Sequence, residues 1–205
     1  MTVAISDPCS AATERTLSVP APEEIRQVKQ RLPTILSGQP DLLDNATVIA
    51  RLEQKLTWSS QASNARLLLP VSIRYRGAVN AYCRLVTASG GVEDVVLVAL
   101  PAQVNFDDCR AISDLRYMDI NGDGMLDVVE GVLVKSNASS FQVAIPLVYR
   151  SSPAAGSGYC YPEGASRQLA PADLKSAACI RRVLEIAKNR RGIAVFSCAP
   201  SGTAH

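Results

Sequence analysis

One short segment of the chain carries oxygen-bearing side chains at alternating positions. From residue 119 to residue 130 the sequence reads Asp-Ile-Asn-Gly-Asp-Gly-Met-Leu-Asp-Val-Val-Glu. A hard cation such as calcium takes six to eight oxygen ligands at about 2.3–2.6 Å. Carboxylates placed this close together repel one another unless a cation neutralises them. The spacing therefore predicts a calcium-binding loop.

The predicted ligands are four side-chain oxygens and one backbone carbonyl, the latter from the methionine. They belong to Asp119, Asn121, Asp123, Met125 and Asp127. Gly124 stands where a tight metal loop must turn sharply. The alternative is an acidic turn in which Asn-Gly and Asp-Gly only close a hairpin. That alternative does not account for Asp119 and Asp127, which flank the turn at ligand spacing.

The residues on both sides of the loop favour strands over helices. A valine-rich run with an internal glycine follows the loop, and residues 115–118 alternate before it. The segment 117–129 resembles the loop of FG-GAP and VCBS repeats, which occur in integrin-like propellers and many bacterial extracytoplasmic proteins. The resemblance implies a loop that joins two strands and binds calcium through the same five positions. The chain has no second copy, whereas propellers need at least four blades, so the resemblance does not imply a propeller.

Glu130 occupies the twelfth position of the loop, where an EF-hand has a bidentate glutamate. In an EF-hand a helix begins after the ninth position, whereas a strand here would carry Glu130 away from the ion. Whether Glu130 is a ligand is left open.

The composition is typical of a soluble globular protein with one domain. The chain has 205 residues, a net charge of +2 and 47% hydrophobic residues. This small positive balance does not favour nucleic acid or a membrane surface as a partner, and no apolar run approaches the roughly 18 residues of a membrane-spanning helix. The first residues lack an apolar signal segment, so we expect a mature form whose signal peptide was removed.

Six cysteines are spread along the chain, and there is one histidine. No Cys-x-x-Cys pair is present, which leaves few ligands for a zinc site. The even count and wide spacing, together with a calcium loop, predict disulfide bonds and a periplasmic or secreted protein. The alternative is a set of buried reduced cysteines. We expect Cys83 to pair with Cys109, and Cys160 to pair with Cys179 or Cys198.

The order of the elements predicts an α+β fold. We expect an antiparallel β-meander or sandwich with N-terminal helices and a C-terminal helix. Residues 1–21 are expected to form a flexible tail, and residues 22–205 a single calcium-binding domain. Within that domain we expect a helical part over 22–57, a β-rich part over 65–150 and a helix over 171–191.

Finer boundaries follow from periodicity and from turn-forming residues. The first helix is expected to begin at Pro22 and to break at Pro33. A second helix is expected from about Asp44 or Asn45 to Leu56, with a strand over 47–49 as the alternative. A loop is expected over 151–164, and residues 193–196 could add a last strand. The candidate strands of the middle part are 67–75, 79–87, 92–100, 115–118, 125–135 and 141–149.

No catalytic machinery is recognisable. Hydrolysis near neutral pH most often uses histidine as the base, and the only histidine is the terminal His205. There is no Gly-x-Ser-x-Gly motif, phosphate-binding glycine loop or dinucleotide fingerprint. We therefore expect a protein that is not an enzyme. A carboxylate pair for glycoside hydrolysis stays open, with five candidates. They are Glu93, Asp94, Asp107, Asp108 and Glu130.

The favoured hypothesis is a non-enzymatic extracytoplasmic protein whose calcium-stiffened scaffold presents loops to another protein. In style the chain is similar to small bacterial periplasmic inhibitor and immunity proteins, which implies a toxin or a cell-wall hydrolase as partner. Contacts are expected on the basic C-terminal helix and in the loops 59–64 and 151–164. The alternatives are a polysaccharide or cell-surface binding module, for which Trp58 is the only tryptophan, and a carboxylate-dependent hydrolase.

The basic residues of the C-terminal helix have two readings. They are Arg181, Arg182, Lys188, Arg190 and Arg191. One reading is a docking patch. The favoured one is a solvated face whose last cations match the helix dipole.

Overall fold

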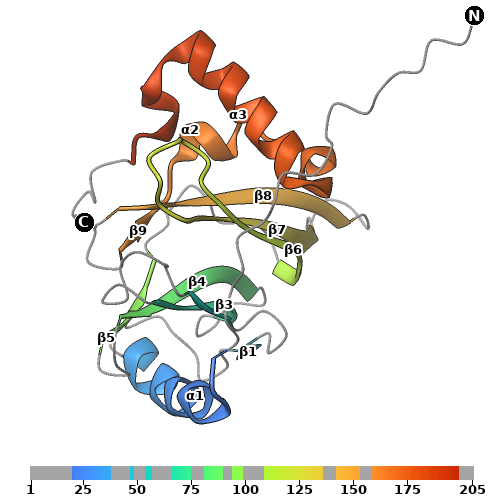
Figure 1. Ribbon diagram of the computed structural model, residues 1–205. Helices are drawn as coiled ribbons and strands as arrows, with labels where there is room; N and C mark the ends of the chain where they lie inside the picture. The colour runs from blue at the N-terminus through green and yellow to red at the C-terminus, as the bar shows by residue number, and fades with distance from the viewer. Residues whose placement is uncertain are drawn as a thin grey trace, which may run out of the picture.

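Four layers make up the fold: a helix, two antiparallel sheets and a second group of helices (Figure 1). This is the α+β class that the sequence predicts, in its sandwich form. The computed structural model describes residues 20–37, 47–48, 54–56, 66–74, 81–89, 94–98, 109–135, 142–152 and 158–198. The tail expected over 1–21 lies outside these ranges except for Pro20 and Ala21.

The first sheet is built around one hairpin. Its strands are β1 (Thr47–Val48), β2 (Gln54–Leu56), β3 (Arg66–Arg74), β4 (Ala81–Ser89) and β5 (Asp94–Leu97). Strands β3 and β4 pair along their whole length, from Arg66 opposite Ser89 to Arg74 opposite Ala81. The short β1 and β2 both pair with the other edge of β3, and β5 extends the sheet beyond β4.

The second sheet is an antiparallel meander that contains the predicted metal loop. Its strands are β6 (Cys109–Met118), β7 (Asp127–Lys135), β8 (Gln142–Ser151) and β9 (Tyr159–Cys160). They pair in chain order. All six strands expected in the middle part of the chain are present, although β6 begins earlier than the sequence predicts. The short β9 and the start of α2 fall within the segment 151–164, where only a loop was expected.

Strand β7 separates two hydrophobic cores. Val128 and Val132 point into the core between the sheets, where Leu85 of the first sheet also lies. Val129 faces the opposite way and packs in a second core with Ile180. Successive side chains of a strand alternate between its faces, so one strand can contribute to both layers. The second sheet is therefore covered on both faces.

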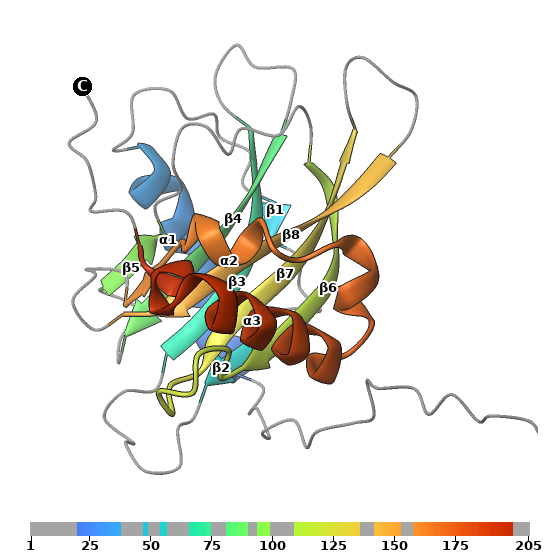
Figure 2. The same cartoon turned by 90° about the horizontal axis from the view of Figure 1, so that it is seen from above.

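Helices cover the outer faces of the sandwich (Figures 1 and 2). On the first sheet lies α1 (Pro22–Ser37), with Val28 and Leu32 buried. On the second sheet lie α2 (Glu163–Ser166), the 3₁₀ turn η4 (Pro171–Lys175), α3 (Ala177–Arg191) and the 3₁₀ turn η5 (Ile193–Phe196).

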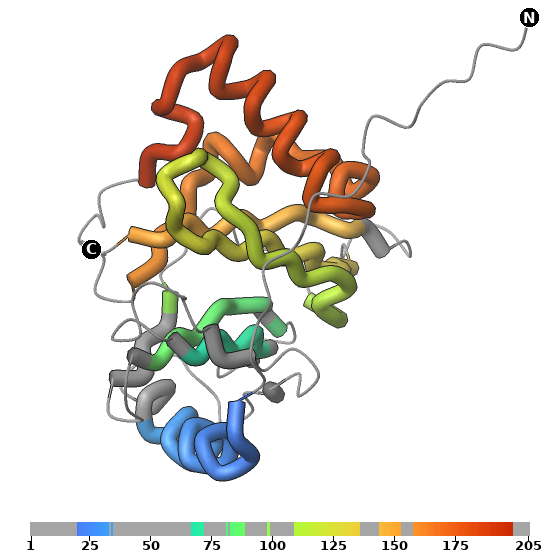
Figure 3. The backbone as a smooth tube through the Cα atoms, viewed as in Figure 1, coloured from blue at the N-terminus to red at the C-terminus, as the bar shows by residue number. Residues whose placement is uncertain are grey.

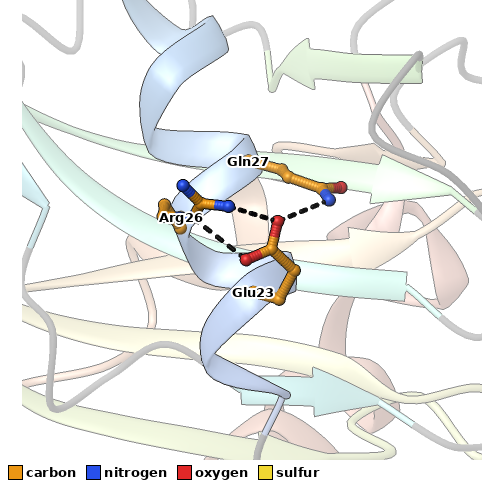
Figure 4. A network of polar contacts seen from close by, with 3 residues as sticks. All are labelled: Glu23, Arg26 and Gln27. Carbon is orange, nitrogen blue, oxygen red and sulfur yellow. Dashed lines mark hydrogen bonds and ion pairs between the residues drawn. The ribbon is translucent and has the colours of Figure 1, made fainter.

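The start of α1 is held by an exposed polar network (Figure 4). The Glu23 carboxylate accepts hydrogen bonds from Arg26 Nη2 at 2.8 Å and from Gln27 Nε2 at 2.9 Å. The Arg26 guanidinium is the main cause, and the Gln27 amide a further one, of a Glu23 pKa below its usual range. An acidic side chain in the first turn also suits the helix dipole.

Two helix predictions are wrong. The helix α1 does not break at Pro33 but continues to Ser37. A proline within a helix removes one backbone donor, and here that loss is tolerated. The helix expected from about residue 44 to residue 56 is replaced, wherever the structure describes it, by β1 and β2. Pairing of both segments with β3 overrides their weak helical periodicity. The alternative of a strand at 47–49 is confirmed for Thr47 and Val48.

The C-terminal helix is shorter than predicted. Ser176 interrupts the expected run because its backbone is extended, and its Oγ caps α3 by accepting a hydrogen bond from Cys179 N at 3.2 Å. The helix ends at Gly192, where φ is +73°, a conformation that favours glycine. Residues 193–196 form η5 rather than the expected strand.

Disulfide bonds connect the layers. Cys83 of β4 is bonded to Cys109 of β6, which joins the two sheets across their shared core. Cys160 of β9 is bonded to Cys198, which fixes the segment after η5. Cys179 is also disulfide-bonded. The pairing of Cys83 with Cys109 is thus confirmed, and Cys198 is the partner of Cys160.

Candidate metal centre

The predicted metal loop closes the hairpin between β6 and β7. Strand β6 ends at Met118 and β7 begins at Asp127, so strands lie on both sides of the loop. Gly122 and Gly124 both have φ of +83°, which allows the two sharp turns. The loop rises from the sheet towards the helical layer (Figure 3). Lys188 of α3 meets it there, because its Nζ donates a hydrogen bond to the Asn121 carbonyl at 3.2 Å.

Asp119 organises the interior of the loop. Its Oδ1 accepts a hydrogen bond from Gly122 N at 2.7 Å, and its Oδ2 accepts one from Gly124 N at 2.8 Å. One carboxylate thereby fixes both glycine turns.

Asn121 and Asp123 interact with each other at the tip. The Asn121 side-chain amide donates to Asp123 Oδ2 at 2.7 Å, and Asp123 N donates to Asn121 Oδ1 at 3.1 Å. Asp123 Oδ1 accepts a further hydrogen bond from Met125 N at 2.8 Å. Asp123 is exposed and Asn121 is half-buried, so solvent reaches this end of the loop.

Asp127 is different because its side chain is completely buried. Its Oδ2 accepts a hydrogen bond from Ile120 N at 3.0 Å, and its Oδ1 accepts one from Ser151 N at 2.7 Å. The carboxylate therefore ties the first part of the loop to the end of β8. Burial raises the pKa of Asp127 to about 7. The two backbone donors oppose this rise, whereas the Asp123 and Asp119 carboxylates add to it.

The donor set suits a hard cation, since three carboxylates, an amide oxygen and the Met125 carbonyl offer oxygen ligands. In the arrangement seen here the carboxylates accept hydrogen bonds from N–H groups of the loop and, for Asp127, also from Ser151 N of β8. Within the described part of the chain, no group of three or more His, Cys, Asp and Glu side chains could hold a metal ion. The five-ligand assignment stays a prediction.

Glu130 lies away from the loop. It is fully buried on β7, on the same face as Val128 and Val132, and so it points between the two sheets. Asp127 lies on the other face of the strand. A strand at this position removes Glu130 from the ligand set and places it outside any open cleft that could bind a substrate. Of the other acidic residues considered for catalysis, Asp94 begins β5, and Glu93, Asp107 and Asp108 lie outside the described residues.

A cavity of about 410 Å³ adjoins the loop. Its lining residues are Tyr117, Asp119, Ile120, Asn121, Gly122, Leu126, Arg181, Glu185 and Lys188. The three residues from α3 are spaced by four and three positions, which places them on one side of the helix. That spacing is the signal in the sequence that predicts a shared face, but nothing in it indicates that this face lies against the loop.

The outward face of α3 was also only partly anticipated. Ile186 and Ile193 are the large hydrophobic residues that the structure exposes within its described ranges, at 41% and 69%. The sequence predicts the basic character of α3. It does not predict that Ile186 on α3 and Ile193 at the start of η5 are exposed. The expected contact loop 59–64 and Trp58 lie outside the described residues.

Comparison with known proteins finds no family model, no curated protein and no solved structure that matches this chain. Among the helices that the structure describes, none has the length and apolar character needed to span a bilayer.

Proposed function

We propose that this chain is a non-enzymatic extracytoplasmic calcium-binding protein that binds another protein, in the manner of bacterial inhibitor and immunity proteins. The observation that carries the proposal is the β6–β7 loop, in which oxygen-bearing side chains are gathered between two strands with buried side chains. The disulfide bonds support an oxidising compartment. Calcium is also sufficiently abundant outside the cytosol for a site with a dissociation constant of about 0.1–1 mM.

In this proposal the metal has a structural role. Asp119, Asn121, Asp123 and Asp127 would supply side-chain oxygens, and Met125 its carbonyl. Bound calcium would neutralise the carboxylates and stiffen the hairpin. An ion that binds only the folded state stabilises that state by mass action.

The outer surface of α3 is where we place the protein partner. Arg182 and Arg190 are exposed one helical turn on either side of Ile186. Arg191, at the end of α3, and Ile193, which begins η5 after the turn at Gly192, are exposed as well. We name these five residues the α3 surface. Dipole matching accounts for Arg190 and Arg191 at the end of the helix, but not for exposed isoleucines. Apolar side chains flanked by arginines are typical of protein contact surfaces.

The metal part of the proposal is tested by thermal unfolding. Calcium at millimolar concentration should raise the melting temperature of the wild-type chain above its value in a chelator. The Asp123→Ala variant should fold but lose this increment, because it lacks a central ligand. Asp114→Ala, which removes a carboxylate outside the loop, should retain it. If calcium leaves the wild-type melting curve unchanged, the loop is not a calcium site.

The partner part is tested by lysis assays. The wild-type chain should slow the digestion of bacterial cell walls by a lysozyme. The double variant Ile186→Ser/Arg190→Glu should lose at least tenfold in inhibition, since each change removes a contact of the α3 surface. Lys135→Glu, at the exposed end of β7, makes the same charge change elsewhere and should inhibit like wild type. Equal inhibition by all three proteins would show that another surface is used.

A further inference from the structure

A group of polar side chains is enclosed between the two sheets. Glu130 is fully buried there, and neither of its carboxylate oxygens has a hydrogen-bond partner. The hydroxyl groups of Tyr117 and Tyr149, both buried, also have no partner at strict hydrogen-bond geometry, although the Tyr149 hydroxyl lies close enough to Glu130 to affect its pKa. Buried polar groups in proteins are nearly always hydrogen-bonded, either to protein or to internal water. Unpartnered groups that lie together therefore indicate that they interact with one another or with water.

The neighbours of Glu130 are mostly neutral donors. Tyr149 of β8 and Tyr117 of β6 lie close enough to Glu130 for its negative charge to help raise their pKa values. Burial holds the pKa of both phenols well above the usual value, so they stay protonated. Behind them lie Tyr159 of β9, whose hydroxyl donates to the Leu126 carbonyl at 3.1 Å, and Tyr161, whose ring meets that of Tyr149 edge-on at 6.4 Å.

Arg84 of β4 is the cation that faces this group. It is 6% exposed, and its Nη1 donates a hydrogen bond to the Cys83 carbonyl at 2.9 Å. Its charge lowers the pKa of Glu130, as does the Tyr149 hydroxyl, but the effect of burial is larger. The net result is a Glu130 pKa of about 8. An ionised carboxylate would lose its hydration at this position, and the attraction of the Arg84 charge is smaller than that loss.

We propose that Glu130 is an internal proton-binding site, a neutral carboxylic acid that shares hydrogen bonds with Tyr149 and Tyr117, directly or through enclosed water. The proton gives the carboxyl group one donor in addition to its acceptor oxygens, so it can satisfy a phenol oxygen as well as accept from a phenol hydroxyl. The Glu130 side chain lies on the opposite face of β7 from Asp127.

This assignment has a consequence for stability with a definite sign. A glutamate in the unfolded chain titrates near pH 4.3, whereas Glu130 in the folded chain titrates near pH 8. Between these values the folded state keeps a proton that the unfolded state has lost. The free energy of unfolding must therefore fall as pH rises through this range, and level off above it. One linked proton changes the unfolding equilibrium constant about tenfold per pH unit.

The test compares the full wild-type chain with Glu130→Gln, an uncharged replacement of the same shape, by urea unfolding from pH 4 to pH 9 in a chelator. The ratio of unfolding constants, wild type to variant, should change least near pH 4, should rise by about tenfold per pH unit between pH 5 and pH 7, and should level off above pH 8. Asp127 contributes equally to both proteins, so it cancels. Glu185→Gln changes an exposed glutamate of α3, so its unfolding constant should depend on pH in the same way as that of the wild type. A ratio that is flat across this window would overturn the proposal.

Infrared spectroscopy gives a second readout that does not depend on unfolding. At pH 6 the wild-type spectrum minus that of Glu130→Gln should contain the carbonyl stretch of a protonated carboxyl group, because Asp127, with a pKa of about 7, contributes equally to both spectra. If that variant does not fold, Tyr149→Phe serves instead. Removing this hydroxyl removes a group that favours the ionised form, so the protonated band should persist to higher pH than in wild type. A difference spectrum at pH 6 that lacks this band would contradict the assignment.

Discussion

Asp127 shows how much a single residue adds to the predicted loop. The spacing of acidic residues predicts Asp127 as a ligand, but not that it is buried or that it accepts backbone hydrogen bonds from Ile120 and Ser151. Both contacts depend on the path of the chain beyond the loop, and Ser151 lies 24 positions away. A local pattern contains no information on such a partner. The spacing therefore predicts which residues form the site, but not that Asp127 is buried whereas Asp123 is exposed.

Asp127→Asn should destabilise the protein even without metal. The amide keeps one acceptor but turns a donor towards a backbone N–H, leaving that N–H unsatisfied in the interior. We expect a loss of about 1–3 kcal/mol in unfolding free energy. Urea unfolding at pH 8 in a chelator measures this at a pH where Asp127 is ionised.

Asp123→Asn is the matched control, because it makes the same substitution at the exposed tip. Its effect should stay within about 0.5 kcal/mol, as is usual for surface changes. Equal losses in the two variants would mean that the buried contacts of Asp127 contribute nothing special.

At the scale of elements, close packing of η4 against β7 explains the glycine in the valine run. A Cβ added to Gly131 would lie 2.7 Å from Leu174 Cδ1 and 3.0 Å from Ser113 Oγ. The valines on both sides of Gly131 predict a strand, and the structure has one. The sequence does not predict the close approach, because η4 comes from a segment more than 35 positions later in the chain.

Gly131→Ala should therefore cost about 1–3 kcal/mol of stability through overcrowding. Leu174→Ala alone should cost about 2–5 kcal/mol by leaving a cavity. In the double variant the new methyl group enters the space that the leucine leaves, so the two losses should sum to less than their separate values. A double-mutant cycle from urea unfolding measures this coupling. Strict additivity would show that the two side chains do not compete for space.

The errors in the helices have the same physical origin. Residues 47–48 and 54–56 carry a weak helical pattern, yet both segments pair with β3. Ser176 stops the C-terminal helix because its side chain bonds better as a cap than within a helix. Propensity and periodicity describe one segment at a time, whereas pairing with a distant strand decides the outcome.

At the scale of the whole molecule, the sequence predicts the class of fold better than its layering. Turn-forming residues between β-rich segments predict an antiparallel meander or a sandwich. The run from Val128 to Val134 does carry a signal for the layering, since its apolar residues do not alternate with polar ones. Such a run indicates a strand that is buried on both faces. The identity of the two covering layers does not follow from it.

The bond between Cys83 and Cys109 should hold the two sheets together in solution. These residues are 26 positions apart. By the chain-entropy estimate, closing a loop of this length stabilises a protein by about 3–4 kcal/mol. The variant Cys83→Ser/Cys109→Ser should lose about that amount in urea unfolding. Cys160→Ser/Cys198→Ser is the comparison, because it leaves the link between the sheets intact. A double variant at 83 and 109 as stable as wild type would contradict a stabilising role.

The enclosure of the second sheet on both sides restricts how such a protein can diversify. Residues 127–132 of β7 are all buried, and the valines among them pack in one hydrophobic core or the other, so substitutions there lower the stability of the fold. The outward side of α3 has no such constraint, because its exposed side chains do not pack in either hydrophobic core. Relatives of this chain should accordingly vary most along that helix and least along the strand beneath it.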